Sequence, residues 1–462
     1  MMTDKTNTNV YLDGALGAAF AKTAMPIIIM MLVNGSFNLV DAYFLGIFVG
    51  AEALTAVTSM FPLFMLMVAL STLVSNGFSS VMSRLLGAGK LSEAKQAFAQ
   101  AISLSLIVCG LLMSFFLLFG QQLTLAANNG NNELATMSIN YMAMLIYCSP
   151  LMFILTINSD SLRCEGFAGF IALVSLLTVL LNGTLNYLFI AILDYGVIGS
   201  AYGTVLAQLL ALALVAGFRY SSRNRNALPT IQLSMNRSHW REFLALGAPS
   251  SLNYLGVALT SAAVLYNLQH WMNADYATTV SAYGIITRLM TFVFLPLLGL
   301  SMAFQSITGN NIGAKQYQRT NHCIKIALVS ALVYCVVIEV LLQLLNDRLG
   351  GFFVNDIAVI NEVSRILPIT TLALFLLGPL MMITMFFQSI GDAVRASILG
   401  LSKTYLFALP LVFILPAVIG EQGVWYAGPT AEILALTLTL TVLYQRSRRH
   451  NYRFGLLYND SK

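Results

Sequence analysis

The chain has 462 residues, of which 58% are hydrophobic and only 9% are charged. Soluble globular proteins carry about 25% charged residues, so this composition excludes a soluble protein and indicates a polytopic membrane protein. The formal net charge of +5 does not indicate nucleic-acid binding, because the basic residues lie between apolar segments and form no patch with aromatic residues.

The polar N-terminus predicts no removable signal peptide, because no short apolar core with a small-residue cleavage site follows it. The cysteines are scattered without a CxxC pair, which favours small apolar packing residues over disulfides or a metal site. They are Cys109, Cys148, Cys164, Cys323 and Cys335. We therefore expect no metal and no cofactor.

A membrane-spanning helix needs about 20 apolar residues. By this measure we expect an all-α protein with about twelve transmembrane helices, over residues 17–46, 53–84, 93–119, 134–158, 167–192, 197–220, 242–270, 277–308, 320–346, 360–388, 395–419 and 423–445. The most polar internal stretch, 219–241, separates six helices from six. This predicts an N-terminal lobe over 1–221, a cytoplasmic linker over 222–241 and a C-terminal lobe over 242–462 with a basic tail.

Lysine and arginine residues are concentrated on the side of the predicted bundle that holds both termini, which by the positive-inside rule is cytoplasmic. The predicted outer loops contain two arginines, Arg348 and Arg365, against eight acidic residues. The tryptophans Trp240, Trp271 and Trp425 fall at predicted helix ends, where interfacial anchors are common.

Short sequence anchors recur in the two halves at a nearly constant separation along the chain. They are residues 86–90 (LGAGK) with 312–315 (IGAK), Gly166 with Gly391, and Gly196 with Gly423. Because six helices is an even number, the two copies share one orientation. The pattern predicts a parallel repeat about an axis along the membrane normal, as in several secondary transporters.

The first predicted helix contains an aspartate, Asp41, within an otherwise apolar stretch. An ionised carboxylate at the centre of a membrane costs about 3 kcal/mol, so such residues usually bind an ion or a substrate. Asn34, Asn38 and Asp41 are spaced i, i+4 and i+7, which places them on one face of the helix. We interpret Asp41 as the coupling residue of a transporter; the alternative is a structural, hydrogen-bonded acid.

A second polar stripe lies along one face of the fifth helix and consists of Thr178, Asn182 and Asn186. The sixth helix adds Thr204 and Gln208. If both helices face the first, they form an oxygen-rich site with its carboxylate. Neutral amides are able to hydrogen-bond a protonated carboxyl or to coordinate sodium through their oxygens. Ordinary hydrogen bonding between helices is the alternative.

Pro26 precedes Asp41 in the same helix and removes one backbone hydrogen bond, so it is a candidate hinge or a static bend. The second half has three ionisable residues within predicted helices, Arg288, Glu339 and Glu432. We expect Arg288 and Glu432 to pair across helices, because buried charges are normally paired. Glu339 is expected to reach the outer interface.

Enzyme functions find little support in this sequence. The histidines lie near helix ends without an HExxH motif, and residues 389–392 (SIGD) match the GxGD of intramembrane aspartyl proteases only in part. No Walker A motif is present, so ATP is not the direct energy source. The many methionines and phenylalanines are expected to pack or face lipid, and some to line an adaptable apolar cavity.

The whole chain resembles the multidrug and toxic compound extrusion (MATE) transporters, most closely their DinF-like branch. The similar segments are residues 37–46 (FNLVDAYFLG), 83–89 (SRLLGAG), 162–166 (LRCEG), 181–189 (LNGTLNYLF) and 423–429 (GVWYAGP). The resemblance implies two six-helix lobes around a V-shaped cavity. It also implies export of cationic or amphipathic compounds in exchange for protons or sodium ions.

The resemblance further implies that Asp41 takes the proton, that its helix bends at Pro26, and that Asn182 and Thr204 complete the coupling site. This sequence departs from the family at Asn186, where a second carboxylate is often present. Beyond their first turns it also lacks an acid in the seventh and tenth helices, where the NorM-like branch has its cation site. Both departures favour proton exchange through Asp41 over sodium binding.

We therefore predict a proton-coupled, monomeric drug exporter of a prokaryotic plasma membrane, in contact with membrane lipids. The first alternatives are a sodium-coupled antiporter and a flippase for lipids or lipid-linked oligosaccharides. A flippase usually needs a strongly basic cavity, and Arg288 is the one basic residue counted within the predicted helices. A receptor or a membrane-embedded enzyme is the more distant alternative.

Overall fold

The computed structural model describes residues 9–44, 48–128, 130–221, 228–271, 276–450 and 452–458, and for 37–44, 51, 54 and 450 it describes the helix but not the side chains. Throughout this part of the chain the architecture is helical, apart from one isolated bridge between Arg453 and Leu457. The predicted all-α class is therefore confirmed.

The described part of the first half contains eight complete α-helices and one complete π-helix. They are α1 (Leu16–Phe44), α2 (Ala51–Ser59), α3 (Phe61–Gly87), α4 (Leu91–Ala127), α5 (Asn132–Tyr147), α6 (Ser149–Cys164), α7 (Ala168–Asn186), η2 (Tyr187–Ile192) and α8 (Gly196–Tyr220). The predicted second span, 53–84, is divided at Met60 into α2 and α3. Pro62 explains the division, because proline is favoured in the first turn of a new helix.

The second half repeats this order. It contains α9 (Trp240–Trp271), α10 (Tyr276–Gly313), α11 (Tyr317–Leu349), η3 (Gly350–Phe352), α12 (Ile357–Thr370), α13 (Leu374–Ser389), α14 (Ala393–Leu401), η4 (Ser402–Ala408), α15 (Leu409–Ile419) and α16 (Gln422–His450). Between the halves, residues 228–239 are irregular and lie against the first half, where Asn158 donates to the carbonyl of Thr230.

Ten helical segments of the described chain are long and apolar enough to cross a membrane. Two bent pairs, α5 with α6 at 45° and α12 with α13 at 50°, raise this number to twelve if each pair is one span. Each bent pair is the fourth span of its half, and each half has a π-helix, η2 or η4, in its fifth span. These matching irregularities support the repeat found in the sequence.

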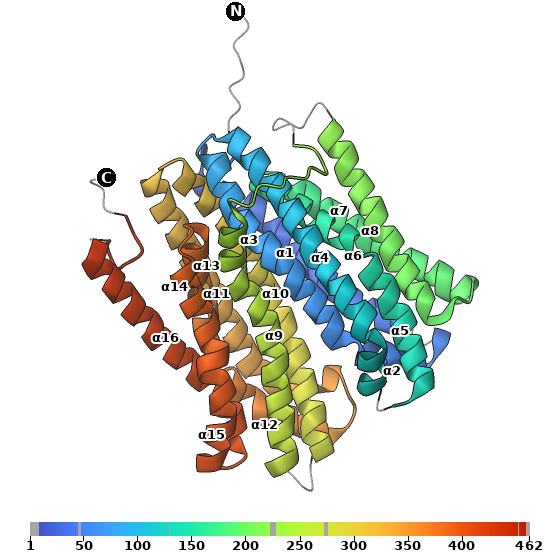
Figure 1. The fold of residues 1–462 in the computed structure, drawn as a ribbon. Coiled ribbons are helices and arrows are strands. Elements are labelled where there is room, and N and C mark those ends of the chain that lie inside the picture. Colours follow the sequence, from blue (N-terminus) through green and yellow to red (C-terminus); the bar gives the residue numbers. More distant parts are fainter. Residues whose placement is uncertain are drawn as a thin grey trace, which may run out of the picture.

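The two halves meet along α1, α3, α9 and α10 (Figure 1). Both chain ends lie at one end of the molecule, which we call the termini end, whereas α2 and α5 lie well apart from α9 and α12 at the opposite end. Near the termini end the backbones of the halves are in direct contact. A Cβ atom on Gly77 would lie 1.9 Å from the carbonyl oxygen of Phe243, and one on Gly247 would lie 1.8 Å from that of Leu73.

Candidate functional site

A chain of hydrogen-bonded side chains, two of them buried, joins the fifth and sixth spans of the first half. Asn186 Nδ2 donates to Asn182 Oδ1 at 3.0 Å, and Asn182 Nδ2 donates to Thr204 Oγ1 at 3.0 Å. Asn186 is completely buried and Asn182 is 3% exposed. The structure thus brings together three of the residues singled out in the sequence, and we call them the amide chain.

Local backbone geometry explains how the amide chain fits between its helices. Asn186 ends α7, and the π-helix η2 begins at the next residue, which widens the backbone turn at this point. On α8, a Cβ atom at Gly203 would lie 2.2 Å from Asn186 Oδ1. Glycine is therefore required there for α8 to approach the amide.

The other members of the polar stripe do not join this chain. Thr178 donates to the carbonyl of Val174 in its own helix at 2.7 Å, and Gln208 is half-buried on α8. A threonine bonded in this way is satisfied within its helix and contributes no free donor to a site.

Helix α1 packs against α7 and α10, and Ala24, Ile27, Ile171 and Val174 belong to one hydrophobic cluster. The helix continues through Pro26, which is half-buried. Asn34 is exposed. The side chains of Asn38 and Asp41 lie outside the described residues, although the helix that carries them is described to Phe44.

The segment after α1 returns to the end of α7. The ring of Phe48 meets the ring of Tyr187 edge-on, with centroids 6.2 Å apart. The first and fifth spans therefore pack together near Ile27, and the residues that directly follow α1 and α7 meet beyond the position of Asp41.

The predicted pair of Arg288 and Glu432 is wrong. Glu432 is buried on α16 and forms an ion pair through Oε1 with Lys403 of η4, whereas Arg288 is exposed on α10. The sequence analysis did not single out Lys403, although it lies inside a predicted span. Glu339 of α11 accepts the backbone N–H of Phe375 through its Oε2 at 2.7 Å and so caps the start of α13.

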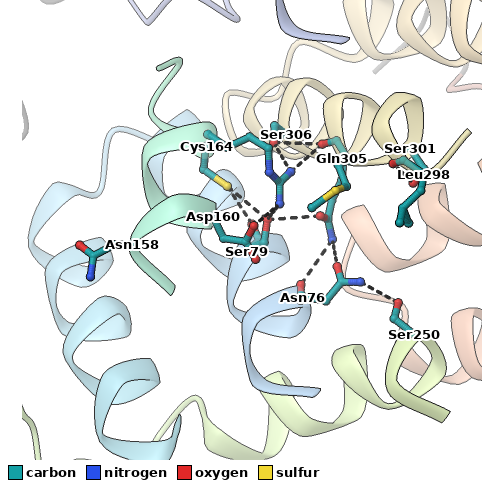
Figure 2. A network of polar contacts seen from close by, with 12 residues as sticks. Asn76, Ser79, Asn158, Asp160, Cys164, Ser250, Leu298, Ser301, Gln305 and Ser306 are labelled. Atoms are coloured by element: carbon teal, nitrogen blue, oxygen red, sulfur yellow. Dashed lines mark hydrogen bonds and ion pairs between the residues drawn. The ribbon is translucent and has the colours of Figure 1, made fainter. Parts of the chain in front are cut away.

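A second buried network connects the two halves near the termini end (Figure 2). Arg163 of α6 is 3% exposed and donates to Asp160 Oδ1 at 2.9 Å within its own helix. It also donates to Met302 O at 2.6 Å and Ser306 Oγ at 2.7 Å, both on α10, and to Ser79 Oγ of α3 at 3.0 Å. The guanidinium therefore ties the first half to the second.

Neutral side chains extend this network across the interface (Figure 2). Ser79 Oγ donates to Gln305 Oε1 at 3.2 Å, Gln305 Nε2 donates to Asn76 Oδ1 at 2.9 Å, and Asn76 Nδ2 donates to Ser250 Oγ at 2.6 Å. Four helices, α3, α6, α9 and α10, are joined in this way.

Further polar contacts at the termini end add to the closure. Arg84 forms an ion pair with Glu242 at 2.6 Å, and Asn9 Nδ2 donates to Asn310 Oδ1 at 2.7 Å. Tyr11 donates to the carbonyl of Arg163 at 2.6 Å, and burial raises the pKa of its hydroxyl. The two halves are therefore closed against each other at this end.

Sequence reasoning missed Asp160 and Arg163, because the predicted span ended at residue 158. Their spacing of i, i+3, with opposite charges directly after an apolar stretch, was the available signal. Within the described residues, no three His, Cys, Asp or Glu side chains lie close enough together to hold a metal ion.

Comparison with known proteins agrees with this architecture. The MatE family model matches residues 26–188 and 249–414. The probable multidrug resistance protein YoeA of Bacillus subtilis is 22% identical over 90% of each chain, and the multidrug export protein MepA of Staphylococcus aureus is 25% identical over 91% of this chain and 92% of its own.

Among solved structures, one described as the outward-facing conformation of a multidrug resistance MATE family transporter superposes with a TM-score of 0.86. It is 24% identical and covers 96% of this chain and 98% of its own. At this identity the likeness concerns the fold. Because the family model covers well over half of the chain, we conclude that the chain belongs to the MATE family of membrane transporters and is not an enzyme.

Proposed function

We propose that this transporter exports cationic or amphipathic drugs in exchange for protons and that it belongs to the DinF-like branch. The observation that carries the proposal is the amide chain of Asn186, Asn182 and the half-buried Thr204, on spans beside the helix of Asp41. Buried polar side chains without a charge of their own are suited to hold a carboxyl group in both its protonation states. Its relatives MepA, a multidrug export protein, and YoeA, a probable multidrug resistance protein, support drugs as the exported compounds.

Asp41 is proposed as the residue that takes the proton. Helices α1 and α7 both begin at the termini end and run side by side. They share a hydrophobic cluster at Ile27 and Ile171, and Phe48 touches Tyr187 beyond the end of α1. Asp41 falls between these two levels, as Asn182 does on α7. Asn34 and Asn38 are proposed to complete the site, and Pro26 to provide the hinge.

One carboxylate is sufficient to drive export. One charge that crosses 100 mV releases about 2.3 kcal/mol, which corresponds to a substrate gradient of roughly 50-fold. The position of Asn186 on α7 carries an amide rather than a second acid, so we assign a single proton to the first half. Sodium coupling is the alternative that the experiment below separates.

The closed termini end is proposed to be the cytoplasmic side of a prokaryotic plasma membrane. The positive-inside pattern places both termini there, and the Arg163 network seals that end. The state would then be outward-facing, like that of the solved relative. We further propose lobes over residues 1–221 and 242–462, joined by the linker 222–241, in a transporter that works as a monomer.

The test is dye efflux from proteoliposomes under a proton gradient and, separately, a sodium gradient. We expect protons alone to drive efflux in the wild type, and Asp41→Asn to abolish it while the protein still inserts. Asp194→Asn is the matched control, because Asp194 is an exposed acid of the same half with a φ of 53°, which asparagine tolerates.

Gradient-driven efflux retained in Asp41→Asn would refute the role of Asp41. Sodium-driven efflux would indicate that the amide chain coordinates a sodium ion. Movement of lipid instead of dye would favour a flippase.

A further inference from the structure

The ion pair of Lys403 and Glu432 lies inside the second half. Glu432 is 8% exposed, and the side chain of Lys403 is about one third exposed (33%). Lys403 meets Glu432 Oε1, while Glu432 Oε2 is buried without a hydrogen-bond partner in the described part of the chain. A buried carboxylate with one unused oxygen retains the capacity to bind a further donor or a cation.

Lys403 is the counter-charge of this carboxylate. Cys335 and Glu339 of α11 interact electrostatically near the pair, and neither is a cation. Helices α13 and α15 contain no titratable side chain. The remaining charged groups on α12 and α14, which also pack against α16, are engaged elsewhere: Glu362 with Arg365, and Arg395 with Asp392.

The internal repeat relates this pair to the amide chain of the first half. The separation of Gly166 from Gly391 along the chain maps Lys403 onto Thr178. The separation of Gly196 from Gly423 maps Glu432 onto the position directly after Thr204. The second half therefore carries a base and an acid on the spans that hold neutral polar residues in the first half.

The counterpart of Asp41 has the opposite character. The separation of the LGAGK segment from the IGAK segment maps Asp41 onto Asn267, a buried residue of α9 whose Nδ2 donates to the carbonyl of Ala263. The acid of the second half has thus moved from the first span of the repeat to the sixth, and a lysine on the fifth span accompanies it.

We propose that Glu432 forms a monovalent-cation site in the second half, and that the ammonium group of Lys403 fills this site as a tethered cation and so keeps it out of ion exchange. The inference rests on the proposed function for its meaning in transport, because it explains a single exchanged ion. The class of ligand is a small monovalent cation, either a proton or sodium, that would occupy Glu432 once Lys403 is removed. A buried carboxylate without its partner is costly, so another cation is expected to replace the ammonium.

The direct test uses purified full-length protein and needs no transport. We compare the thermal stability of wild type, Lys403→Gln, Lys403→Arg and the double variant Lys403→Gln/Glu432→Gln in sodium chloride and in choline chloride, and at lowered pH. Among these four proteins, we expect only Lys403→Gln to show a higher Tm in sodium chloride than in choline chloride, or a higher Tm at lowered pH. Lys403→Arg retains a tethered cation, and the double variant has no carboxylate, so both should behave as the wild type.

A sodium response identifies a sodium site, and an acid response identifies a proton site. If Lys403→Gln responds to both treatments no more than the double variant does, the proposal is overturned. An equal sodium response in the wild type would overturn it too, because the lysine would then not fill the site.

Transport provides the second test, through the substrate gradient reached at steady state with the membrane potential held at zero. Each proton exchanged per substrate contributes about tenfold to this gradient for each pH unit. We expect Glu432→Gln to reach the same gradient as the wild type, even if it reaches it more slowly. A gradient about tenfold lower per pH unit would show that Glu432 itself exchanges a proton, which contradicts the tethered-cation role.

This second arm also decides the case if Lys403→Gln fails to fold. Failure of the proposed function is recognised separately, since the wild type would then show no gradient-driven efflux, whereas the stability comparison would still report on Glu432.

Discussion

The two halves of this transporter share one helix order but distribute their charge in opposite ways. In the first half, the fifth and sixth spans carry the neutral amide chain of Asn182, Asn186 and Thr204. In the second half, the same spans carry the ion pair of Lys403 and Glu432. The amide chain brings no charge that would neutralise the proposed titrating carboxylate of Asp41. In the second half, the carboxylate of Glu432 is already neutralised by Lys403.

This difference shows how a duplicated fold can specialise without changing its architecture. The bent fourth span and the π-helix in the fifth span are retained in both halves. We propose that a few side chains then decide which half exchanges ions. The predictions below test this comparison in order of decreasing effect.

The largest effect is expected where the two halves are tied together, at Arg163. Arg163→Met leaves Asp160 buried without its partner and removes the bonds to Met302 and Ser306. Breaking a buried ion pair from one side costs about 3–5 kcal/mol. We expect the closed termini end to open, which is measured by the labelling rate of a cysteine placed at Ser250.

The labelling rate must be compared with that of the same cysteine in the otherwise unchanged chain. Lys90→Met is a suitable control, since Lys90 is an exposed base at the same end of the molecule whose ion pair with Glu93 lies within one half. If both variants label equally, Arg163 does not hold the halves together.

A smaller effect is expected within the first half, at Asn182. Asn182→Ala leaves the amide of Asn186 and the hydroxyl of Thr204 without the bonds that the structure shows. The loss of a buried partner costs about 1–3 kcal/mol, so proton affinity at the site should change by about tenfold or more. The measurement is the pH dependence of dye efflux. An unchanged pH profile would show that the amide chain takes no part in proton coupling.

A change in the second half, at Glu339 of α11, should affect stability rather than transport. Glu339→Ala removes the acceptor for the N–H of Phe375 and should destabilise the protein by about 1 kcal/mol, as the loss of a helix cap does. Thermal unfolding measures this loss, and the pH profile of efflux should stay that of the wild type. A shifted profile would mean that the second half also takes part in coupling.

The smallest effect is expected for Glu93→Gln at the termini end. Its partner Lys90 and Glu93 itself are about half exposed, and exposed ion pairs contribute at most about 1 kcal/mol. Neither efflux nor thermal stability should change measurably in moderate salt. A larger loss would indicate that charge at this end influences the closure of the two halves.

Composition and apolar length were sufficient to predict the helical class and the number of spans, because the bilayer fixes how long each apolar segment must be. They did not predict the break at Met60, where apolar residues continue on both sides and only Pro62 marks the new helix. The polar spacing on the fifth helix indicated Asn182 and Asn186 correctly as neighbours, since residues four apart share a helix face.

Pairings between distant helices were the part that the sequence could not provide. Glu432 has Lys403 as its partner instead of Arg288, because the choice depends on which helices pack together and on their rotation. The bonds from Arg163 to α10 could not be predicted either, because these partners belong to the other half and lie far away along the chain. Such contacts become visible only when the two halves are placed side by side.

The central claim is that the first half holds the exchangeable proton on Asp41. The most direct measurement is the release of protons when drug is added to the purified transporter in weakly buffered solution, for wild type, Asp41→Asn and Asp194→Asn. The account predicts release from the wild type and Asp194→Asn and none from Asp41→Asn. Equal release from Asp41→Asn would contradict it and would place the proton elsewhere in the molecule.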